Sequence, residues 1–292
     1  MPCGGASRAR GASEPAVSIS FMKTTRSHRL SIGAALVLAV TLGIGACSGK
    51  PASTPTEDST ANVVQSEEEE AQPEEVDGPT QAELQAYFEA LATADPGKMA
   101  EAVEMAAPGS NAQAYAIYLT GSAQADRDAG YTTEVQEVET IEGGFAFCPE
   151  GVSENPCSEF TNIQHDGNQI ADFDAGGVPL TGRLSLGNGE AQPLGGAGEA
   201  TMVAAYKSIS GAVVAVFEVS SASDGLWVTA TYTAPDGRQS NSTQWSGPTD
   251  LKAGAFANYS FYFAGAEFGG TVELKAIKGD GYDGGTAAFP TQ

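Results

Sequence analysis

The chain has 292 residues, of which 37 are acidic and 14 are basic, and its formal net charge at pH 7 is −23. Affinity for nucleic acid rests on basic contacts to phosphate, so this charge argues against a nucleic-acid partner. It argues equally against electrostatic attraction to anionic lipid headgroups.

The N-terminal region predicts export. Three basic residues precede an apolar run of about 15 residues, shorter than the ~20 that span a bilayer as a helix. A charged start, an apolar middle and small residues before a cut are typical of a signal peptide, which we assign to residues 22–46. The alternative is an uncleaved signal anchor. Residues 1–21 precede this complete signal, so we interpret them as an over-called start, with translation beginning at Met22. The basic residues are Lys23, Arg26 and Arg29.

Cys47 follows Ile44-Gly45-Ala46, and these four residues resemble the bacterial lipobox. The resemblance implies cleavage before Cys47 and a diacylated cysteine, the usual palmitate-bearing anchor, as the new N-terminus. Two acyl chains suffice for stable anchoring, at roughly 0.8 kcal/mol per buried methylene. We therefore expect a lipoprotein at the extracytoplasmic face of the cell membrane. Its mature part keeps 9 basic and 36 acidic residues, a net charge of −27.

Residues 47–79 read as the lipidated cysteine followed by a disordered acidic linker. This stretch holds four prolines, several serines and threonines, and the run Glu67 to Glu70, but almost nothing that could form a core. Like charges extend such a chain. We expect it to hold the folded part away from the membrane.

Residues 80–128 predict three helices. Thr80 to Glu83 and Ser110 to Gln113 are capping-box patterns, and Asp95 followed by a proline suits a helix start. Four aromatic residues at helical spacing favour a core, or else the lining of a ligand cavity. They are Tyr87, Phe88, Tyr115 and Tyr118.

Strands are expected from residue 131 onward. Cys148 and Cys157 form an even pair in an exported chain, which predicts a disulfide, with a redox or metal pair as the alternative. A hairpin is expected around His165 to Asn168 because of its Asp-Gly turn. We take residues 80–190 as an α+β domain and 191–200 as a glycine-rich hinge.

Residues 201–286 predict an all-β sandwich with six strands, and 287–292 a short tail. An aromatic stripe on the fifth strand and two tryptophans are expected in its core. The six expected strands are Met202–Ile209, Ala212–Ser220, Leu226–Thr233, Ser240–Trp245, Ala257–Phe263 and Thr271–Ile277. The aromatic residues are Phe256, Tyr259, Phe261, Phe263, Trp227 and Trp245.

Few residues carry recognisable chemistry. His165 is the only histidine after the signal, so a Ser–His–Asp triad would need it, but a polar turn explains it equally well. Two oxygen-rich groups could ligate calcium, although neither matches an EF-hand loop. We predict no catalytic residue, no metal and no cofactor. The oxygen-rich groups are Asp166, Asn168, Asp172, Asp174, and Asp280 to Asp283.

Helices followed by a glycine-turned antiparallel meander resemble the α+β fold of the scytalone dehydratase and ketosteroid isomerase group over about residues 80–186. That resemblance implies a helix-capped sheet around an apolar pocket. The C-terminal part resembles an immunoglobulin-like sandwich, and the lipobox with the Ala-, Gly- and acid-rich composition resembles actinobacterial cell-envelope lipoproteins.

The function expected from these features is a non-enzymatic binding or interaction module of the cell envelope, with a protein or glycan partner. The alternative is a small apolar ligand, or weak enzymatic activity, in the α+β domain. In that case Tyr87, Phe88, Tyr115 and Tyr118 would face a cavity.

Overall fold

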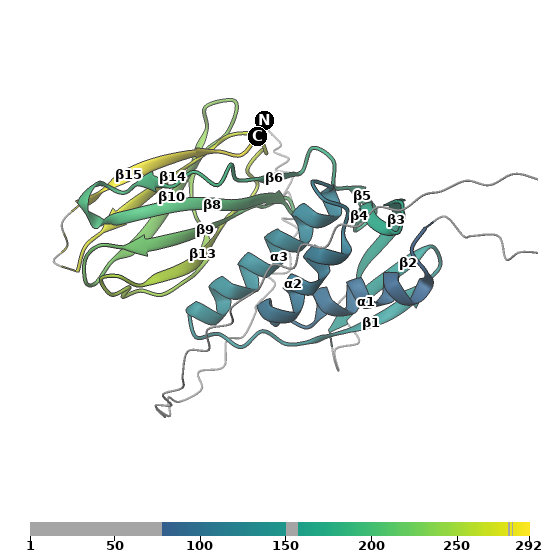
Figure 1. Cartoon of the computed structure of the whole chain (residues 1–292). Helices are drawn as coiled ribbons and strands as arrows, with labels where there is room; N and C mark the ends of the chain where they lie inside the picture. Colours follow the sequence, from purple (N-terminus) through teal and green to yellow (C-terminus); the bar gives the residue numbers. More distant parts are fainter. Residues whose placement is uncertain (1–77, 150–156, 280, 282) are drawn as a thin grey trace, which may run out of the picture. The chain divides into compact units, whose positions relative to one another are not determined.

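The computed structural model describes residues 78–149, 157–279, 281 and 283–292. They lie in one compact unit, Glu70–Gln292. The predictions for the signal peptide, Cys47 and nearly all of the linker lie outside the described residues. What is described consists of three helices and antiparallel β-sheets (Figure 1).

The three predicted helices are confirmed, and side-chain caps begin each of them. They are α1 (Gln81–Ala92), α2 (Pro96–Met105) and α3 (Asn111–Asp128). Thr80 and Glu83 form the expected reciprocal capping box of α1, and Asp95 caps α2 through the Gly97 N–H. At α3 only half of the expected box forms. Ser110 accepts from the Gln113 N–H, but the Gln113 side chain accepts from the Gly109 N–H instead of returning to Ser110.

The first sheet is an antiparallel meander in the order β1-β2-β3-β4-β5. The predicted hairpin is confirmed but is tighter than expected. His165 lies within β3, opposite Ile170, and only Gly167 and Asn168 form the turn. The strands are β1 (Gln136–Ile141), β2 (Gly144–Pro149), β3 (Ser158–Asp166), β4 (Gln169–Ala175) and β5 (Val178–Pro179).

Two further sheets contain the remaining strands. The outer sheet has the order β11-β10-β14-β15, and the middle sheet has the order β12-β13-β9-β8-β6, with β7 also paired to β8. The outer strands are β10 (Trp227–Thr233), β11 (Gln239–Asn241), β14 (Thr271–Ile277) and β15 (Asp283–Pro290). The middle strands are β6 (Leu184–Leu186), β7 (Gln192–Pro193), β8 (Gly198–Lys207), β9 (Val213–Ser221), β12 (Gln244–Ser246) and β13 (Phe256–Phe263).

The middle sheet is buried on both faces. On β9, Ala215 and Phe217 belong to a sandwich core shared with the outer sheet, whereas Val214 and Val216 belong to a helical core shared with the helices and the first sheet. Successive residues of a strand point to opposite faces, so β9 serves both cores at once. The two predicted domains are therefore joined through one sheet.

This joining corrects the expected domain limits. Leu184–Leu186, assigned to the α+β domain, pairs with β8 of the middle sheet. In the expected hinge, Gln192–Pro193 also pairs with β8, and the neighbouring Leu194 and Ala197 are fully buried. Most of the expected C-terminal tail lies in β15, whose Phe289 is paired with Val272.

Two sandwich expectations were also wrong in detail. The expected strand 240–245 is divided, because β11 pairs with β10 of the outer sheet while β12 pairs with β13 of the middle sheet. In the aromatic stripe, Tyr259, Phe261 and Phe263 are fully buried, but Phe256 is 72% exposed. Phe256 differs from the other three by an odd number of residues, so it points to the opposite face of β13. Trp227 and Trp245 are half-buried.

Helix α3 packs closely on the middle sheet. A Cβ added at Gly121 would lie 2.9 Å from Cγ1 of Val216, so the missing side chain permits this approach. At the end of α3, Asp128 accepts from the Asn258 N–H at 2.7 Å, and Asp126 accepts from the Ser246 hydroxyl. The helix is thus joined to β12 and β13 by polar contacts as well as by apolar packing.

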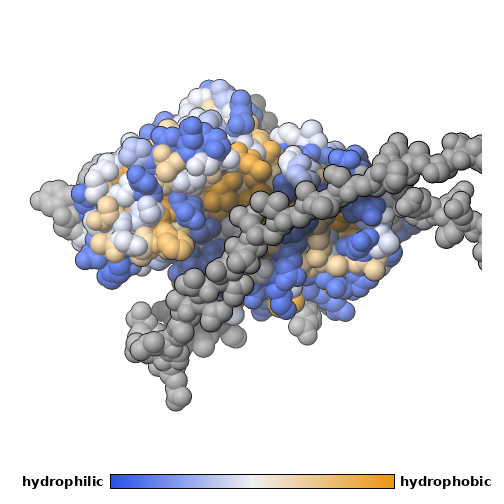
Figure 2. Space-filling model, viewed as in Figure 1, coloured by the Kyte–Doolittle hydropathy of each residue, from blue (hydrophilic) through white to orange (hydrophobic). Residues whose placement is uncertain are grey.

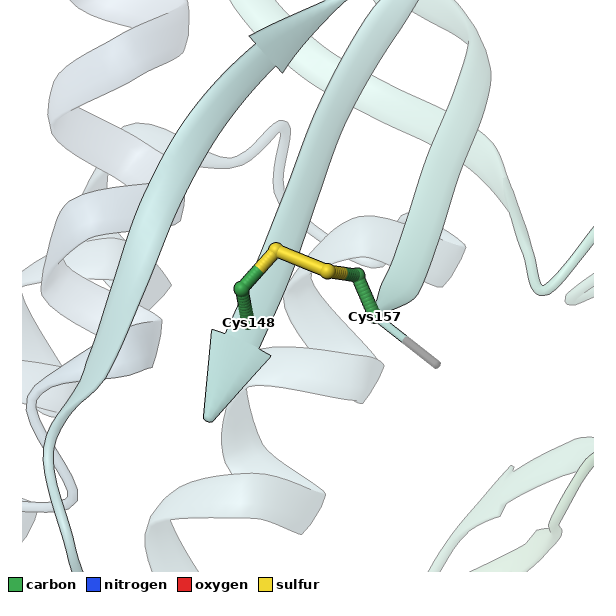
Figure 3. The surroundings of a disulfide bond; sticks show 2 residues. All are labelled: Cys148 and Cys157. Carbon is green, nitrogen blue, oxygen red and sulfur yellow. A yellow bond between two sulfur atoms is a disulfide. The ribbon is translucent and has the colours of Figure 1, made fainter. Parts of the chain in front are cut away.

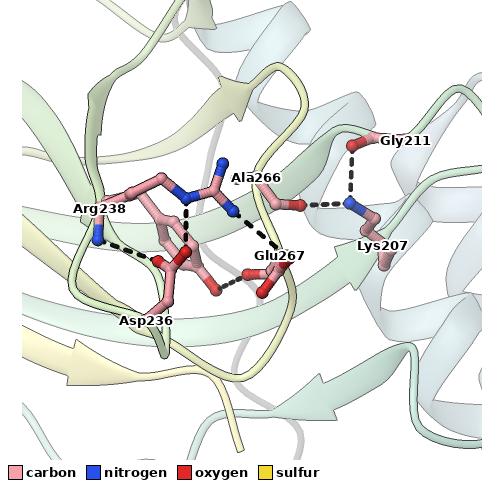
Figure 4. Close-up of polar contacts among 7 residues, drawn as sticks. Lys207, Gly211, Asp236, Arg238, Ala266 and Glu267 are labelled. Carbon is pink, nitrogen blue, oxygen red and sulfur yellow. Dashed lines mark hydrogen bonds and ion pairs between the residues drawn. The ribbon is translucent and has the colours of Figure 1, made fainter.

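Loops at one end of the sandwich are joined by polar contacts (Figure 4). The Lys207 ammonium group donates to the Gly211 carbonyl at 2.7 Å and to the Ala266 carbonyl, and partial burial lowers the pKa of this lysine. Arg238 pairs with Asp236 in its own turn and with Glu267 at 3.3 Å. These contacts join the β8–β9 and β10–β11 turns to the segment between β13 and β14.

Candidate functional site

A pocket of about 250 Å³ lies between the helices and the first sheet. Residues from α1, α2, α3, β1, β2 and β3 line it, together with the segments that follow α1 and α3. Its lining residues are Leu91, Ala92, Ala94, Met99, Tyr115, Leu119, Ser122, Ala123, Asp126, Thr133, Glu134, Gln136, Phe147, Ser158 and Phe160.

The floor of the pocket is apolar and its rim is polar. Met99, Phe147 and Phe160 are each at most 6% exposed. Glu134 and Gln136 are exposed at the rim. The lining thus offers a surface for an apolar body and, at the opening, groups that can bind a polar head.

Residues along one face of α3 contribute both to the apolar floor of the pocket and to its polar rim. Tyr115, Leu119, Ser122 and Asp126 follow one another at spacings of four, three and four residues, so they share one helical face. This face begins with an aromatic ring and ends with a carboxylate. This spacing is the signal in the sequence that our predictions missed, because they used only the apolar members.

Asp126 is the most highly connected rim group. Its carboxylate accepts from the Ser246 hydroxyl and, at 3.4 Å, from the Thr133 hydroxyl. Its charge also adds to burial in raising the pKa of Tyr262 above the usual range. Asp126 is therefore held in place by both the middle sheet and the segment that leads to β1.

Tyr115 lines the pocket and also belongs to the helical core. Burial raises the pKa of Tyr115 far above its ordinary value, and the neighbouring Tyr206 raises it further. The hydroxyl therefore stays protonated near neutral pH.

The other three residues predicted to face a cavity pack into the helical core. Tyr87 and Phe88 are fully buried, with ring centroids 5.1 Å apart in an edge-to-face arrangement. The Tyr87 hydroxyl donates to the Ala112 carbonyl at 2.8 Å. Tyr118 is 5% exposed, and its ring centroid lies 5.0 Å from that of Tyr206. Of the four predicted residues, only Tyr115 lines this pocket.

A disulfide between Cys148 and Cys157 lies beside the pocket wall (Figure 3). The Cα atoms of the two cysteines are 4.4 Å apart. Phe147 and Ser158 come directly before Cys148 and directly after Cys157, pair across β2 and β3, and line the pocket. The disulfide thus joins the two strands one residue beyond the Phe147–Ser158 pair, which forms part of the pocket wall.

The histidine and the carboxylates considered for catalysis or calcium lie elsewhere. His165 is exposed, and its Nδ1 lies 3.2 Å from the Gly167 carbonyl oxygen. Asp172 accepts from Asn111 at 2.9 Å, and Asp174 accepts from Asn162 at 2.6 Å.

A metal site is not formed among the residues that the structure describes. No three His, Cys, Asp or Glu side chains within that part of the chain are grouped so as to hold a metal ion. Asp280, Tyr282 and the side chain of Asp283, the second candidate group, lie outside the described residues.

Comparisons with known proteins give distant structural matches, among them two structures of archaellum proteins. No family model matches the chain, and no curated protein matches it. The archaellum periplasmic stator protein FlaG from Sulfolobus acidocaldarius has a TM-score of 0.22 and 14% identity, over 29% of this chain and 92% of that chain. The FlaF and FlaG complex from the same organism has a TM-score of 0.21 and 12% identity, over 37% of this chain and 88% of that chain. Likeness at this level carries no argument about function.

The three helices in the described part of the chain differ from membrane spans in length or hydropathy. None of α1, α2 and α3 is both long enough and apolar enough to cross a bilayer.

Proposed function

We propose that the chain is an extracytoplasmic binding protein of the cell envelope, held at the membrane by acyl chains on Cys47 and spaced from it by residues 48–79. The observation that carries the binding role is the pocket, whose buried aromatic floor opens through a polar rim. An apolar surface with a few convergent polar groups is the usual form of a small-molecule site.

The folded part supports this role by its rigidity. The pocket walls come from α3, which packs on the middle sheet, and from β2 and β3, which the disulfide joins. A preformed site avoids part of the entropy cost of binding. Within this proposal, the helices and first sheet form a pocket domain like that of the ketosteroid isomerase group, and the outer and middle sheets form an immunoglobulin-like sandwich.

A second candidate function is recognition of an envelope protein, favoured by β1. This strand is the terminal strand of the first sheet, and among the described strands it pairs with β2 alone. Glu137 and Glu139 are exposed along it. An exposed sheet edge can pair with an extended segment of another protein, and these carboxylates favour a segment that carries basic residues. A glycan partner remains part of the same proposal, without a site assigned to it.

Native mass spectrometry of the protein gently extracted from its own membranes tests the binding role. We expect a small molecule to accompany the wild-type protein and to be absent from Ser158→Phe, which places a ring at the pocket wall. His165→Phe, a substitution at an exposed strand position, is the matched control and keeps the molecule. Recovery of the same molecule with Ser158→Phe would contradict binding in this pocket.

Membrane fractionation tests the anchor separately. Cys47→Ser removes the thiol that would carry the acyl chains, so the protein should leave the membrane fraction and lose incorporation of a palmitate analogue. Ser53→Ala, a substitution in the proposed linker, is the control and should change neither. Retention of Cys47→Ser in the membrane fraction would favour the uncleaved signal anchor.

A further inference from the structure

We propose that the pocket selects a small primary amine with an aromatic or branched alkyl body. This inference rests on the proposed binding function and specifies its ligand. It is carried by three properties of the lining, namely its size, its apolar floor and the sign of the charges at its rim.

The size of the pocket limits the ligand. A cavity of about 150 Å³ accepts benzene, and pockets for drug-sized molecules span about 300–1,000 Å³. At about 250 Å³, this pocket lies between the two. It therefore suits a body of one ring or a branched alkyl group with a short polar extension.

The floor determines which end of the ligand is buried. Phe147 and Phe160 are almost fully buried, with ring centroids 4.4 Å apart, and the buried Met99 also lines the pocket. Burial of an apolar group against such a surface contributes about 25 cal/mol per Å² removed from water. The apolar body therefore enters first and the polar group stays near the rim.

The rim determines the charge of the polar group. Asp126 and Glu134 are the carboxylates of the lining, and the lining contains no lysine, arginine or histidine. Arg127, which follows Asp126 in the sequence, forms an ion pair with Asp95 at 3.3 Å. A carboxylate ligand would meet two like charges at this rim, whereas an ammonium group would meet two opposite ones.

The hydroxyls of the lining suit an ammonium group as well. Ser122 and Ser158 lie among the lining residues, and their oxygens can accept hydrogen bonds. An ammonium group has three donors and no acceptor, so two carboxylates and neighbouring hydroxyls match its needs. The strongly acidic chain also raises the local concentration of cations around the pocket.

Isothermal titration at pH 7 tests this inference with phenethylamine and 2-phenylethanol, which share one body and differ in charge. The acylated protein from Cys47 onward is used in nanodiscs, with empty nanodiscs as the blank. We expect saturable binding of the amine, about ten-fold tighter than that of the alcohol in low salt. The preference should shrink as salt is added, because exposed charges are screened.

Three substitutions locate the source of the preference. Glu134→Gln and Asp126→Asn should each weaken amine binding about three-fold, so that together they account for the ten-fold preference, and leave alcohol binding unchanged. Glu142→Gln removes an exposed carboxylate in the β1–β2 turn, outside the lining, and should alter neither. Circular dichroism of each variant checks that it is folded.

The possible outcomes separate this inference from the binding function on which it rests. Equal affinity for amine and alcohol, with both lost in Ser158→Phe, would overturn the amine preference and leave the binding function intact. No saturable binding of the amine would also overturn the preference, and the binding function would then depend on the native mass spectrometry result. Equal weakening of amine binding by Glu142→Gln would attribute the preference to general surface charge and overturn it as well.

Discussion

The carboxylate of Asp128, in the last turn of α3, accepts a hydrogen bond from the Asn258 N–H of β13 at 2.7 Å. The contact joins a helix of the predicted α+β domain to a strand of the predicted sandwich. An acidic residue at a helix C-terminus is unfavourable to the helix dipole. Asp128 is therefore better explained by its contact with the sheet than by any benefit to its own helix.

Asp128→Ala should lower the free energy of unfolding by about 1–3 kcal/mol, because the partly buried Asn258 N–H loses its acceptor. Asp128→Asn keeps an acceptor at the same position and removes the unfavourable charge, so it should lie within about 0.5 kcal/mol of the wild type. Urea unfolding measures both. Equal loss in the two variants would show that charge, and not the hydrogen bond, is what matters.

Gly121→Val should destabilise the contact between α3 and the middle sheet. Its first added carbon would lie 2.9 Å from Val216, and overpacking of this kind costs about 1–3 kcal/mol. Gly196→Val is the control, since a Cβ there meets no atom within 4 Å. Thermal unfolding should separate the two variants by several degrees. A wild-type midpoint for Gly121→Val would mean that α3 can move away from the sheet at little cost.

Loss of the disulfide should lower stability by about 2–3 kcal/mol, the loop-entropy contribution for a short closed loop. Cys148→Ser with Cys157→Ser should also weaken ligand binding, because Phe147 and Ser158 line the pocket immediately beside the disulfide. Urea unfolding and titration with phenethylamine check the two effects. Unchanged binding in a folded double variant would show that the strand pairing alone maintains the pocket wall.

Stability should fall steeply as the pH rises above about 10. Burial raises the pKa values of Tyr87, Tyr115 and Tyr118 in the folded state, so the unfolded state releases their protons first. Their contribution is fully present below pH 10 and is lost above it. Each such tyrosine costs about 1.4 kcal/mol per pH unit in that range. Denaturant unfolding between pH 8 and pH 11.5 measures the slope.

Tyr115→Phe tests the assignment of that slope to buried tyrosines. It removes one titrating hydroxyl from the group and should reduce the slope by about 1.4 kcal/mol per pH unit. An unchanged slope would mean that Tyr115 ionises equally easily in the folded and unfolded states.

Local sequence signals made the helices predictable, whereas the positions of several strands depend on the strands with which they pair. Thr80 and Asp95 are caps that act within three residues, so sequence spacing alone reveals them. β15 was missed because half of its residues are glycine or alanine, and it becomes a strand by pairing with β14. The residues following Gln239 read as one strand, but they divide between two sheets because β10 and β13 each take one part.

The pocket was only partly predictable for a similar reason. Tyr115 was identified from its helical spacing. Asp126 and Glu134 line the same pocket only because α3 and the segment before β1 come together in the fold. Tyr87 and Phe88 carry the same aromatic signal as Tyr115, and yet they lie in the filled core. Helical spacing indicates which face of a helix packs against the rest of the protein. Tertiary packing decides whether that face is filled completely or leaves a pocket.

Because the middle sheet is buried on both faces, the protein cannot be cut into two independently folding fragments at the expected domain boundary. A fragment that ends before Gly198 would leave α3 without the strands on which it packs, and a fragment that begins there would expose Val214 and Val216 to water. The part of the chain from α1 to β15 is therefore the smallest portion that we expect to be inherited, exchanged or expressed as one piece.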